Sequence, residues 1–217
     1  MDKELSDEDF MGRLERAGIL KAMVISRNLE GFRDAKDLRH LVCRWCPALH
    51  TFLFSFGELT VTLEDVVNNF LLPVLGDENP FNINLSDEDL KVEEKLFTHF
   101  GGCTASSSGK QARMGWWVMS LSCEKDKEVR RAGFLAFWLS KFLFSEFPRY
   151  GIKSAFFPLA ISLAKGAQYP LAPCSWAMFI LSWFSFMKMK PRVTLVMQLL
   201  LLFVVPSSRY LCGIVLR

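Results

Sequence analysis

The feature of this sequence that most constrains its fold is a change of hydrophobic period between residues 51 and 63. The run Thr51–Phe56 carries a phenylalanine at every second position, and a second alternating run, Leu59–Leu63, follows shortly after Gly57. Alternation with a period of two places side chains on opposite faces of a strand, and two such runs around a glycine are typical of a β-hairpin. We therefore predict one small hairpin in this part of the chain.

Most of the remaining chain has the helical period, with apolar residues recurring every three or four positions. This pattern predicts helices over residues 5–30, 34–45, 63–70, 86–100, 126–145 and 154–165. Thr62, with Asp65 three residues later, is predicted to cap the third of these helices, and Ser86 to cap the fourth. The fourth helix is predicted to end at the pair Gly101 and Gly102. The predicted fold class is mainly α with one small β-hairpin.

The composition changes abruptly near residue 171. Residues 171–217 contain five basic residues and no acidic ones, whereas residues 1–170 contain 21 basic and 23 acidic residues. The tail also carries two uncharged apolar runs, at 171–187 and 193–205, and a membrane-spanning helix needs about 20 such residues. Two interpretations are open: a membrane hairpin formed by residues 171–217, or a segment that is read out of frame from near Cys174. We favour the second, which predicts a helical domain truncated at its C-terminal side and followed by an apolar tail.

Charge and cysteine usage exclude several classes of protein. Residues 1–170 are slightly acidic and lack the dense Lys/Arg stripe of an electrostatic nucleic-acid surface, so direct binding to nucleic acid is not expected. The first nine residues are polar and acidic, unlike a secretory signal. The six cysteines are therefore expected to be reduced and mostly buried.

Motifs that carry chemistry are sparse in this chain. Cys43 and Cys46 have the spacing of a CxxC pair, but a zinc site usually needs two such pairs, and a redox CxxC opens a helix whereas this one closes the predicted helix 34–45. His40, His50 and His99 show no spacing typical of a metal site or a catalytic triad. We therefore expect no metal, no cofactor and no catalytic residues, and an enzyme of unknown type remains an alternative that no group of residues supports.

Residues 38–76 carry a specific resemblance. They are similar to the plant mobile domain, also called the aminotransferase-like mobile domain, of the maintenance-of-meristems-like proteins, and the resemblance covers about residues 35–173. The matching residues include Arg44, Trp45, Pro47, His50, Thr51, Phe52, Phe56, Gly57, Glu58, Thr62, Leu63, Asp65, Pro73 and Gly76. On this basis the chain divides into an N-terminal helical extension (1–34), an incomplete mobile domain (35–173) and an apolar tail outside the family (174–217).

The resemblance implies a role rather than a reaction. Such domains occur in plant developmental proteins and in plant transposable elements, and members are associated with the nucleus, meristem maintenance and transposon silencing. Some act with phosphatases of the phosphoprotein-phosphatase type, and no catalytic residue set is known to carry over. We expect a non-catalytic, nuclear module that binds proteins or associates with chromatin, with phosphatase-type proteins or chromatin factors as partners. The alternative is a form anchored to a membrane through residues 171–217.

The motif residues themselves are expected to be structural. Arg44 and Trp45 at a helix end, the phenylalanines of Thr51–Phe56 on one hairpin face, and Val66 with Val67 on the next helix would form one compact core, since aromatic side chains bury large areas. Asp65 is expected either to cap a helix or to pair with Arg44.

Overall fold

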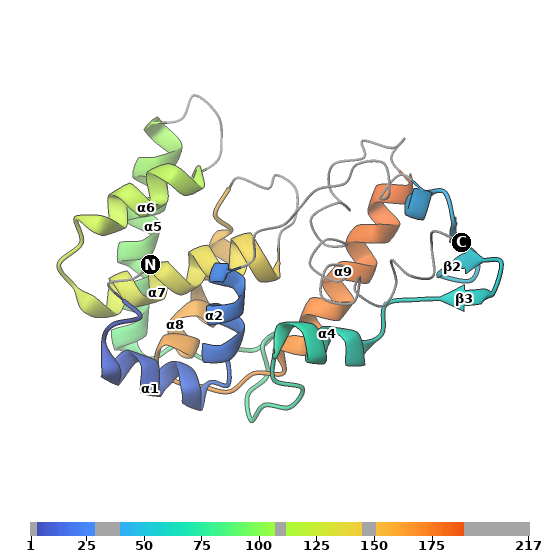
Figure 1. The fold of residues 1–217 in the computed structure, drawn as a ribbon. Helices are drawn as coiled ribbons and strands as arrows, with labels where there is room; N and C mark the ends of the chain where they lie inside the picture. Colours follow the sequence, from blue (N-terminus) through green and yellow to red (C-terminus); the bar gives the residue numbers. More distant parts are fainter. Residues whose placement is uncertain (1–3, 29–39, 107–111, 145–150, 189–217) are drawn as a thin grey trace. The chain divides into compact units, whose positions relative to one another are not determined.

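The computed structural model describes residues 4–28, 40–106, 112–144 and 151–188, and the chain divides into two compact units (Figure 1). Unit 1 combines Met1–Val24 with Pro73–Leu171, and unit 2 combines Ile25–Leu72 with Ala172–Arg217. Most of the described residues are helical, and one small antiparallel sheet lies in unit 2, which confirms the predicted fold class.

Unit 1 is built from helices. Its elements in chain order are α1 (Glu8–Arg16), most of α2 (Leu20–Asn28), α5 (Asp87–Ser106), α6 (Met114–Ser122), α7 (Lys127–Trp138) with a π-helical turn at Leu139–Leu143, and a 3-10 turn at Ser154–Phe156 leading into α8 (Phe157–Ala164). Helix α7 lies at the centre, where it packs against α5, α6 and α8, and α8 is also contacted by α1 and α5.

The predicted helix over residues 5–30 is in fact two helices. Helix α1 ends at Arg16 with Ala17 as its C-cap, and Gly18 follows with a φ of 72°, a left-handed backbone conformation that glycine adopts without a steric penalty. Helix α2 then begins at Leu20. The apolar period alone did not reveal the break, because the buried residues on both sides of it face the same core.

The core of unit 1 is aromatic. The Phe157 ring stacks on Trp117 with 5.5 Å between ring centroids and meets Phe97 edge-on at 5.1 Å. The Trp117 indole nitrogen also donates a hydrogen bond of 3.0 Å to the carbonyl oxygen of Gly133. A Cβ atom at Gly133 would lie 2.5 Å from a methyl group of Leu121, so glycine at this position permits α6 to approach α7 closely.

The predicted end of the helix that begins after Ser86 is wrong. Ser86 and Asp89 form the predicted cap through reciprocal hydrogen bonds, but α5 runs through Gly101 and Gly102 as far as Ser106. Both glycines are exposed to solvent, where glycine only weakens a helix, and continuing the helix brings Cys103 into the core. Burial of that side chain offsets the low helix propensity of the pair.

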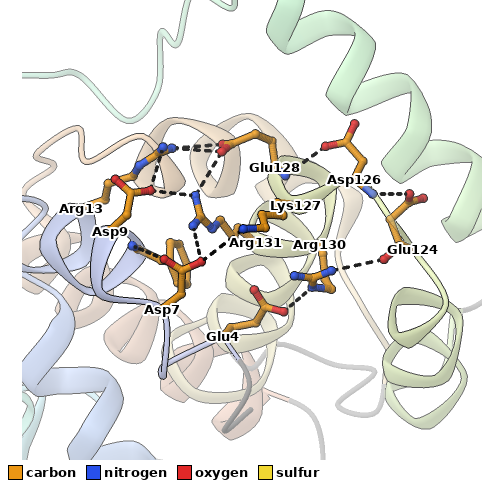
Figure 2. Close-up of polar contacts among 11 residues, drawn as sticks. Glu4, Asp7, Asp9, Arg13, Glu124, Asp126, Lys127, Glu128, Arg130 and Arg131 are labelled. Carbon is orange, nitrogen blue, oxygen red and sulfur yellow. Dashed lines mark hydrogen bonds and ion pairs between the residues drawn. The ribbon is translucent and has the colours of Figure 1, made fainter.

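Ion pairs attach α1 to the start of α7 (Figure 2). The Arg131 side chain is only 4% exposed, and its guanidinium donates to Asp7 at 2.8 Å, to Asp9 at 3.1 Å and to Glu128 at 3.1 Å. It also lies over the Phe10 ring, 5.1 Å from the ring centroid. Burying a guanidinium is costly unless carboxylates surround it, and here three carboxylates from two helices do so.

Further pairs surround this centre. Arg13 on α1 contacts Glu128 on α7 at 3.2 Å, and Arg130 on α7 pairs with Glu4, just before α1. Beneath these charges, Phe10 and Leu14 are fully buried. The apolar contacts therefore supply burial, and the charged contacts fix how α1 lies on α7.

Unit 2 contains the sheet. Strands β1 (Trp45–Cys46), β2 (Thr51–Phe54) and β3 (Gly57–Leu59) form a three-stranded antiparallel sheet in the order β1-β2-β3. A hairpin forms in the predicted part of the chain, from β2 and β3, with Phe52 opposite Leu59. Its second strand is Gly57–Leu59 and not the predicted run Leu59–Leu63, because Leu63 is already the first residue of α4. Strand β1 was not predicted: residues 40–42 are helical, but Trp45 lies in a strand and not in the helix predicted over 34–45, whose residues 34–39 fall outside the described residues.

Two helices complete unit 2. Helix α4 (Leu63–Phe70) begins at the predicted residue, and α9 (Leu171–Lys188) lies in the apolar tail. The Trp176 indole nitrogen of α9 donates a 3.0 Å hydrogen bond to the carbonyl oxygen of Val61, just before α4. Within the described ranges no helix is both long and apolar enough to span a membrane, and the second apolar run, 193–205, lies outside these ranges.

Removing the buried guanidinium should destabilise the protein. We expect Arg131→Met to lower the free energy of unfolding by about 2 to 3 kcal/mol, less than for a fully buried pair because Asp9 and Glu128 remain in contact with water. Lys127→Met is the matched control on the same helix, because Lys127 is 68% exposed and 4.0 Å from Asp7; it should cost less than about 0.5 kcal/mol. Urea unfolding followed by circular dichroism measures both, and equal effects would contradict the role given to Arg131.

The same pairs should make stability depend on acidity. Hydrogen bonds from Arg131 and from the Phe10 backbone lower the pKa of Asp7 below its ordinary value of 3.8. A lowered folded-state pKa stabilises the protein above the ordinary value, and this contribution disappears as the pH falls through the folded-state value. The stability difference between wild type and Asp7→Asn should therefore be largest at neutral pH and shrink as the pH falls below 3.8. A difference that does not change over this range in urea unfolding would disprove the linkage.

Candidate interaction surface

The motif residues in and around the sheet hold it together. Trp45 and Phe52 are almost fully buried, and their rings meet edge-on with 4.9 Å between centroids. The guanidinium of Arg44 lies 5.1 Å from the centroid of the Phe54 ring. The three-phenylalanine face predicted for the hairpin is only partly correct, because Phe56 lies in the turn after β2, where alternation ends, and is 55% exposed.

The turns of the sheet use the polar motif residues. Thr51 donates its hydroxyl to Glu58 at 3.2 Å, and Thr60 donates its hydroxyl to the carbonyl oxygen of His50 at 3.1 Å. His50 and Gly57 both have positive φ angles, of 59° and 142°, and Pro47 lies in the turn between β1 and β2. Each of these side chains or backbone positions closes a turn or links two strands.

Thr62 and Asp65 begin α4 as predicted. The Thr62 hydroxyl accepts a 3.2 Å hydrogen bond from the Asp65 backbone N–H, and the Asp65 carboxylate accepts a 2.8 Å bond from the Thr62 backbone N–H. This reciprocal pair is a capping box, and Leu63 is the first helical residue. Of the two roles proposed for Asp65, the structure shows the cap.

Pro73 and Gly76 belong to unit 1, where they fix a loop. Gly76 lies against the backbone of Tyr169, and a Cβ atom at Gly76 would be 2.6 Å from the Tyr169 Cα. The Glu78 N–H donates a 3.2 Å hydrogen bond to the carbonyl oxygen of Gln168, whose side-chain amide donates a 2.7 Å bond to the carbonyl oxygen of Arg16. The loop is therefore attached to the segment before α9 and, through it, to the end of α1.

The loop closes through a side-chain turn and exposes apolar groups. The side-chain oxygen of Asn79 accepts a 2.9 Å hydrogen bond from the Phe81 N–H. The backbone carbonyl oxygen of Asn79 accepts a 3.2 Å bond from the Asn82 N–H. Within this fixed backbone Leu75 is 83% exposed and Phe81 is 90% exposed. We call residues 73–82 the anchor loop.

A second set of exposed apolar side chains lies in unit 2. It comprises Leu49, Leu53, Phe56 and Leu59 on the sheet and its turns. Most of the exposed large apolar side chains in the described residues fall between residues 49 and 90. Each set lies within one unit and is by itself a candidate surface for binding other molecules.

The sequence carries a signal for these two sets of side chains that hydrophobic periodicity does not show. Residues 45–90 contain eight acidic residues and no lysine or arginine. Both sets of exposed apolar side chains lie in this stretch. The charged residues near each set in the sequence are therefore all acidic. Residues 45–90 would have been found by counting charges in windows of about this length along the chain, whereas the net charge of +3 for the whole chain conceals them.

The cysteines are less buried than predicted. Of the five that the structure describes, Cys43 and Cys123 are exposed, Cys46 and Cys174 are half-buried, and Cys103 is buried. These five are free thiols, so Cys43 and Cys46 are not joined. Burial raises the pKa of the Cys103 and Cys174 thiols, which favours their unreactive protonated form.

One histidine has the partners that sequence spacing did not reveal. The Nδ1 atom of His99 on α5 lies 2.6 Å from the Ser120 hydroxyl, and its Nε2 atom lies 2.9 Å from the Glu124 carboxylate. Sequence spacing could not reveal these partners, because residues 21 and 25 positions apart meet only when α5 packs on α6.

The His99 contacts link α5 to α6 and to the segment that follows α6. Ser120 is the seventh of nine residues in α6, so its own N–H belongs to the hydrogen-bond ladder of the helix and cannot stabilise an oxyanion. Glu124 also accepts a hydrogen bond from the Asp126 backbone N–H, and this bond, followed by the one to His99, lowers the Glu124 pKa. In the described part of the chain no three His, Cys, Asp or Glu side chains are placed to hold a metal ion.

The protein is a mainly helical scaffold, and its motif residues hold strands, turns and helix starts in place. The model of the family described as "Plant mobile domain" matches residues 18–204, and the chain belongs to the plant mobile domain family. This confirms the resemblance found in the sequence. No curated protein and no solved structure matches the chain.

The matched range differs from the predicted domain limits. It begins at residue 18, inside the predicted extension 1–34, and it continues to residue 204, inside the predicted tail 174–217. Helix α1 precedes the matched range although its side chains fill the core of unit 1. The predicted limits and the shifted reading frame remain predictions.

The contact between Gly76 and Tyr169 should be intolerant of any side chain. We expect Gly76→Ala to lower the free energy of unfolding by roughly 1 to 3 kcal/mol, because the added methyl group meets backbone atoms that cannot move aside easily. Gly101→Ala is the matched control: that glycine is exposed in α5 with nothing near its Cβ position, so alanine should stabilise the protein by up to about 1 kcal/mol. Thermal unfolding should show shifts of opposite sign; a neutral Gly76→Ala would contradict the close packing.

Proposed function

We propose that this protein is a non-catalytic protein-interaction module that acts in the plant nucleus, in development such as meristem maintenance or in transposon silencing. Its partners in this proposal are other proteins, of the phosphoprotein-phosphatase type or chromatin factors. The observation that carries the proposal is the presentation of large apolar side chains, such as Leu75 and Phe81, on a backbone that is held by tertiary contacts.

Two physical arguments support this proposal. Exposing a large apolar side chain to water is unfavourable by about 1.5 to 3 kcal/mol relative to burying it, so a surface that exposes several of them can gain that energy on binding a partner. A fixed backbone also lowers the entropy cost of binding, because fewer groups have to be ordered in the complex. The anchor loop has both properties.

Charge argues for protein partners over nucleic acid. Residues 45–90 hold both sets of exposed apolar side chains, and the Asp and Glu residues of this range are not balanced by any lysine or arginine. Phosphate backbones carry a dense negative charge and would be repelled by such a surface. A protein partner can supply apolar and complementary charged side chains together.

The role can be tested by complementation in plants. In a line that lacks this protein, we expect transposon transcripts to rise or meristem organisation to fail, and the wild-type chain should restore either trait. A chain with Leu75→Ser and Phe81→Ser should accumulate in the nucleus but fail to restore it, because the exposed anchors are lost while the fold is kept. A chain with Val118→Ser and Met119→Ser, which are exposed on α6, serves as the matched control and should complement.

Two results would contradict the proposal. The first is a line without the protein that shows neither transposon activation nor a meristem defect. The second is full complementation by the Leu75 and Phe81 variant, which would remove the anchor loop from the function.

A further inference from the structure

The chemistry of the anchor loop identifies the kind of partner that fits it. This inference rests on the proposed function, because it names the partner of the same surface. It is built from three properties of unit 1: a loop of fixed shape, two prominent apolar side chains, and an unbalanced charge around them.

The shape of the loop is set by contacts with the core at Gly76 and Glu78 and by a local turn at Asn79. Gly76 lies against the Tyr169 backbone, the Glu78 N–H donates to Gln168, and the Asn79 side chain holds the turn before Phe81. Tyr169 itself is almost fully buried. The backbone that carries Leu75 and Phe81 is therefore fastened to the core of unit 1.

Leu75 and Phe81 are among the most exposed apolar side chains that the structure describes, at 83% and 90%. A leucine and a phenylalanine at this exposure can each bury a large area against a partner, and such anchors dominate the energy of many interfaces. Val74 beside Leu75 is also partly exposed, at 39%, and the residues between the two anchors are mostly polar, so a partner must itself bring apolar groups to cover Leu75 and Phe81.

The charges near these anchors are negative. Asp77 and Glu78 lie between the anchors in the loop, and Asp87 and Glu88 follow in the first turn of α5; all four are exposed. The nearby cation Lys165 is already paired with Asp89 at 2.5 Å. The side chain of Arg16 lies beside Gly166. The backbone carbonyl oxygen of Arg16 accepts a hydrogen bond from the side-chain amide of Gln168. Along the chain the nearest Lys or Arg residues on the two sides of the loop are Arg44 and Lys91.

We propose that the anchor loop binds a basic segment of a partner protein, in which Lys or Arg residues flank leucine- or phenylalanine-like anchors. The apolar anchors cover Leu75 and Phe81, and the flanking cations face Asp77 and Glu78. Charge complementarity selects this occupant over nucleic acid or an anionic membrane, which the same carboxylates repel.

A defined peptide tests the proposal on the full chain. The probe is a fluorescently labelled peptide of about 12 residues with two leucines and a phenylalanine flanked by lysines, and its binding is followed by fluorescence anisotropy. Two control peptides carry glutamate in place of the lysines or serine in place of the apolar residues. We expect the basic, apolar peptide to bind at least about tenfold more tightly than either control, and more weakly as salt is added.

Variants locate the binding to the loop. Leu75→Ser with Phe81→Ser, and separately Asp77→Lys with Glu78→Lys, should each weaken binding of the basic peptide at least about tenfold. The matched controls are Val118→Ser with Met119→Ser for the apolar pair and Glu93→Lys with Glu94→Lys for the charged pair, and both should bind as wild type does. Thermal unfolding verifies that each variant folds, and Asp77→Asn with Glu78→Gln replaces the charge reversal if that variant does not.

Several results would overturn the proposal. These are equal binding of the glutamate peptide, unchanged binding by the loop variants, or loop-dependent binding of a single-stranded oligonucleotide. A dimer in sedimentation experiments that dissociates in the Leu75 and Phe81 variant would assign the surface to a second copy of the chain. If plants are complemented by the Asp77 and Glu78 charge reversal but not by the Leu75 and Phe81 variant, the proposed function stands and the basic partner does not.

Discussion

The burial of the Arg131 guanidinium between α7 and the carboxylates before and within α1 is the interaction on which the rest of unit 1 depends. The carboxylates of Asp7, Asp9 and Glu128 offset the cost of removing this charge from water, and Phe10 covers it with an aromatic ring. Buried ion pairs contribute little net stability, whereas the full burial of Phe10 and Leu14 contributes several kcal/mol. We therefore assign the stability to the apolar contacts and the orientation of α1 to Arg131.

This orientation extends to the proposed binding surface. The last residue of α1, Arg16, offers its carbonyl oxygen to Gln168, and the carbonyl oxygen of Gln168 accepts from Glu78 in the anchor loop. A helix that precedes the matched family range thus helps to position a loop inside that range. The physical result is a pair of exposed apolar anchors on a backbone whose shape does not depend on the partner, which favours selective binding because little order has to be created in the complex.

Sequence reasoning was most successful where a few neighbouring residues decide the structure. The capping pairs Thr62 with Asp65 and Ser86 with Asp89 rest on hydrogen bonds within four residues, and strand β2 follows the alternation of its phenylalanines; the second strand of the hairpin ends at Leu59, where the predicted alternating run begins. It was wrong where packing overrules local preference. Helix α5 continues through Gly101 and Gly102 because Cys103 is buried, and Trp45 leaves its predicted helix because it pairs opposite Phe52 in the sheet.

The sequence by itself determined the mainly helical class through its hydrophobic period, the family through the motif residues between Leu38 and Gly76, and the acidic, apolar character of residues 45–90 through their composition. The tertiary structure alone decided which of these apolar side chains are exposed and which groups meet across the fold. Phe52 and Phe56 are four residues apart and share the same parity in the alternating run, yet one is buried and the other is exposed, since only Phe52 lies in a strand and packs against Trp45. Arg131 meets Asp7 from 124 positions away, and His99 meets Ser120 only because α5 packs on α6. Such contacts depend on how helices pack, which no local pattern of residues specifies.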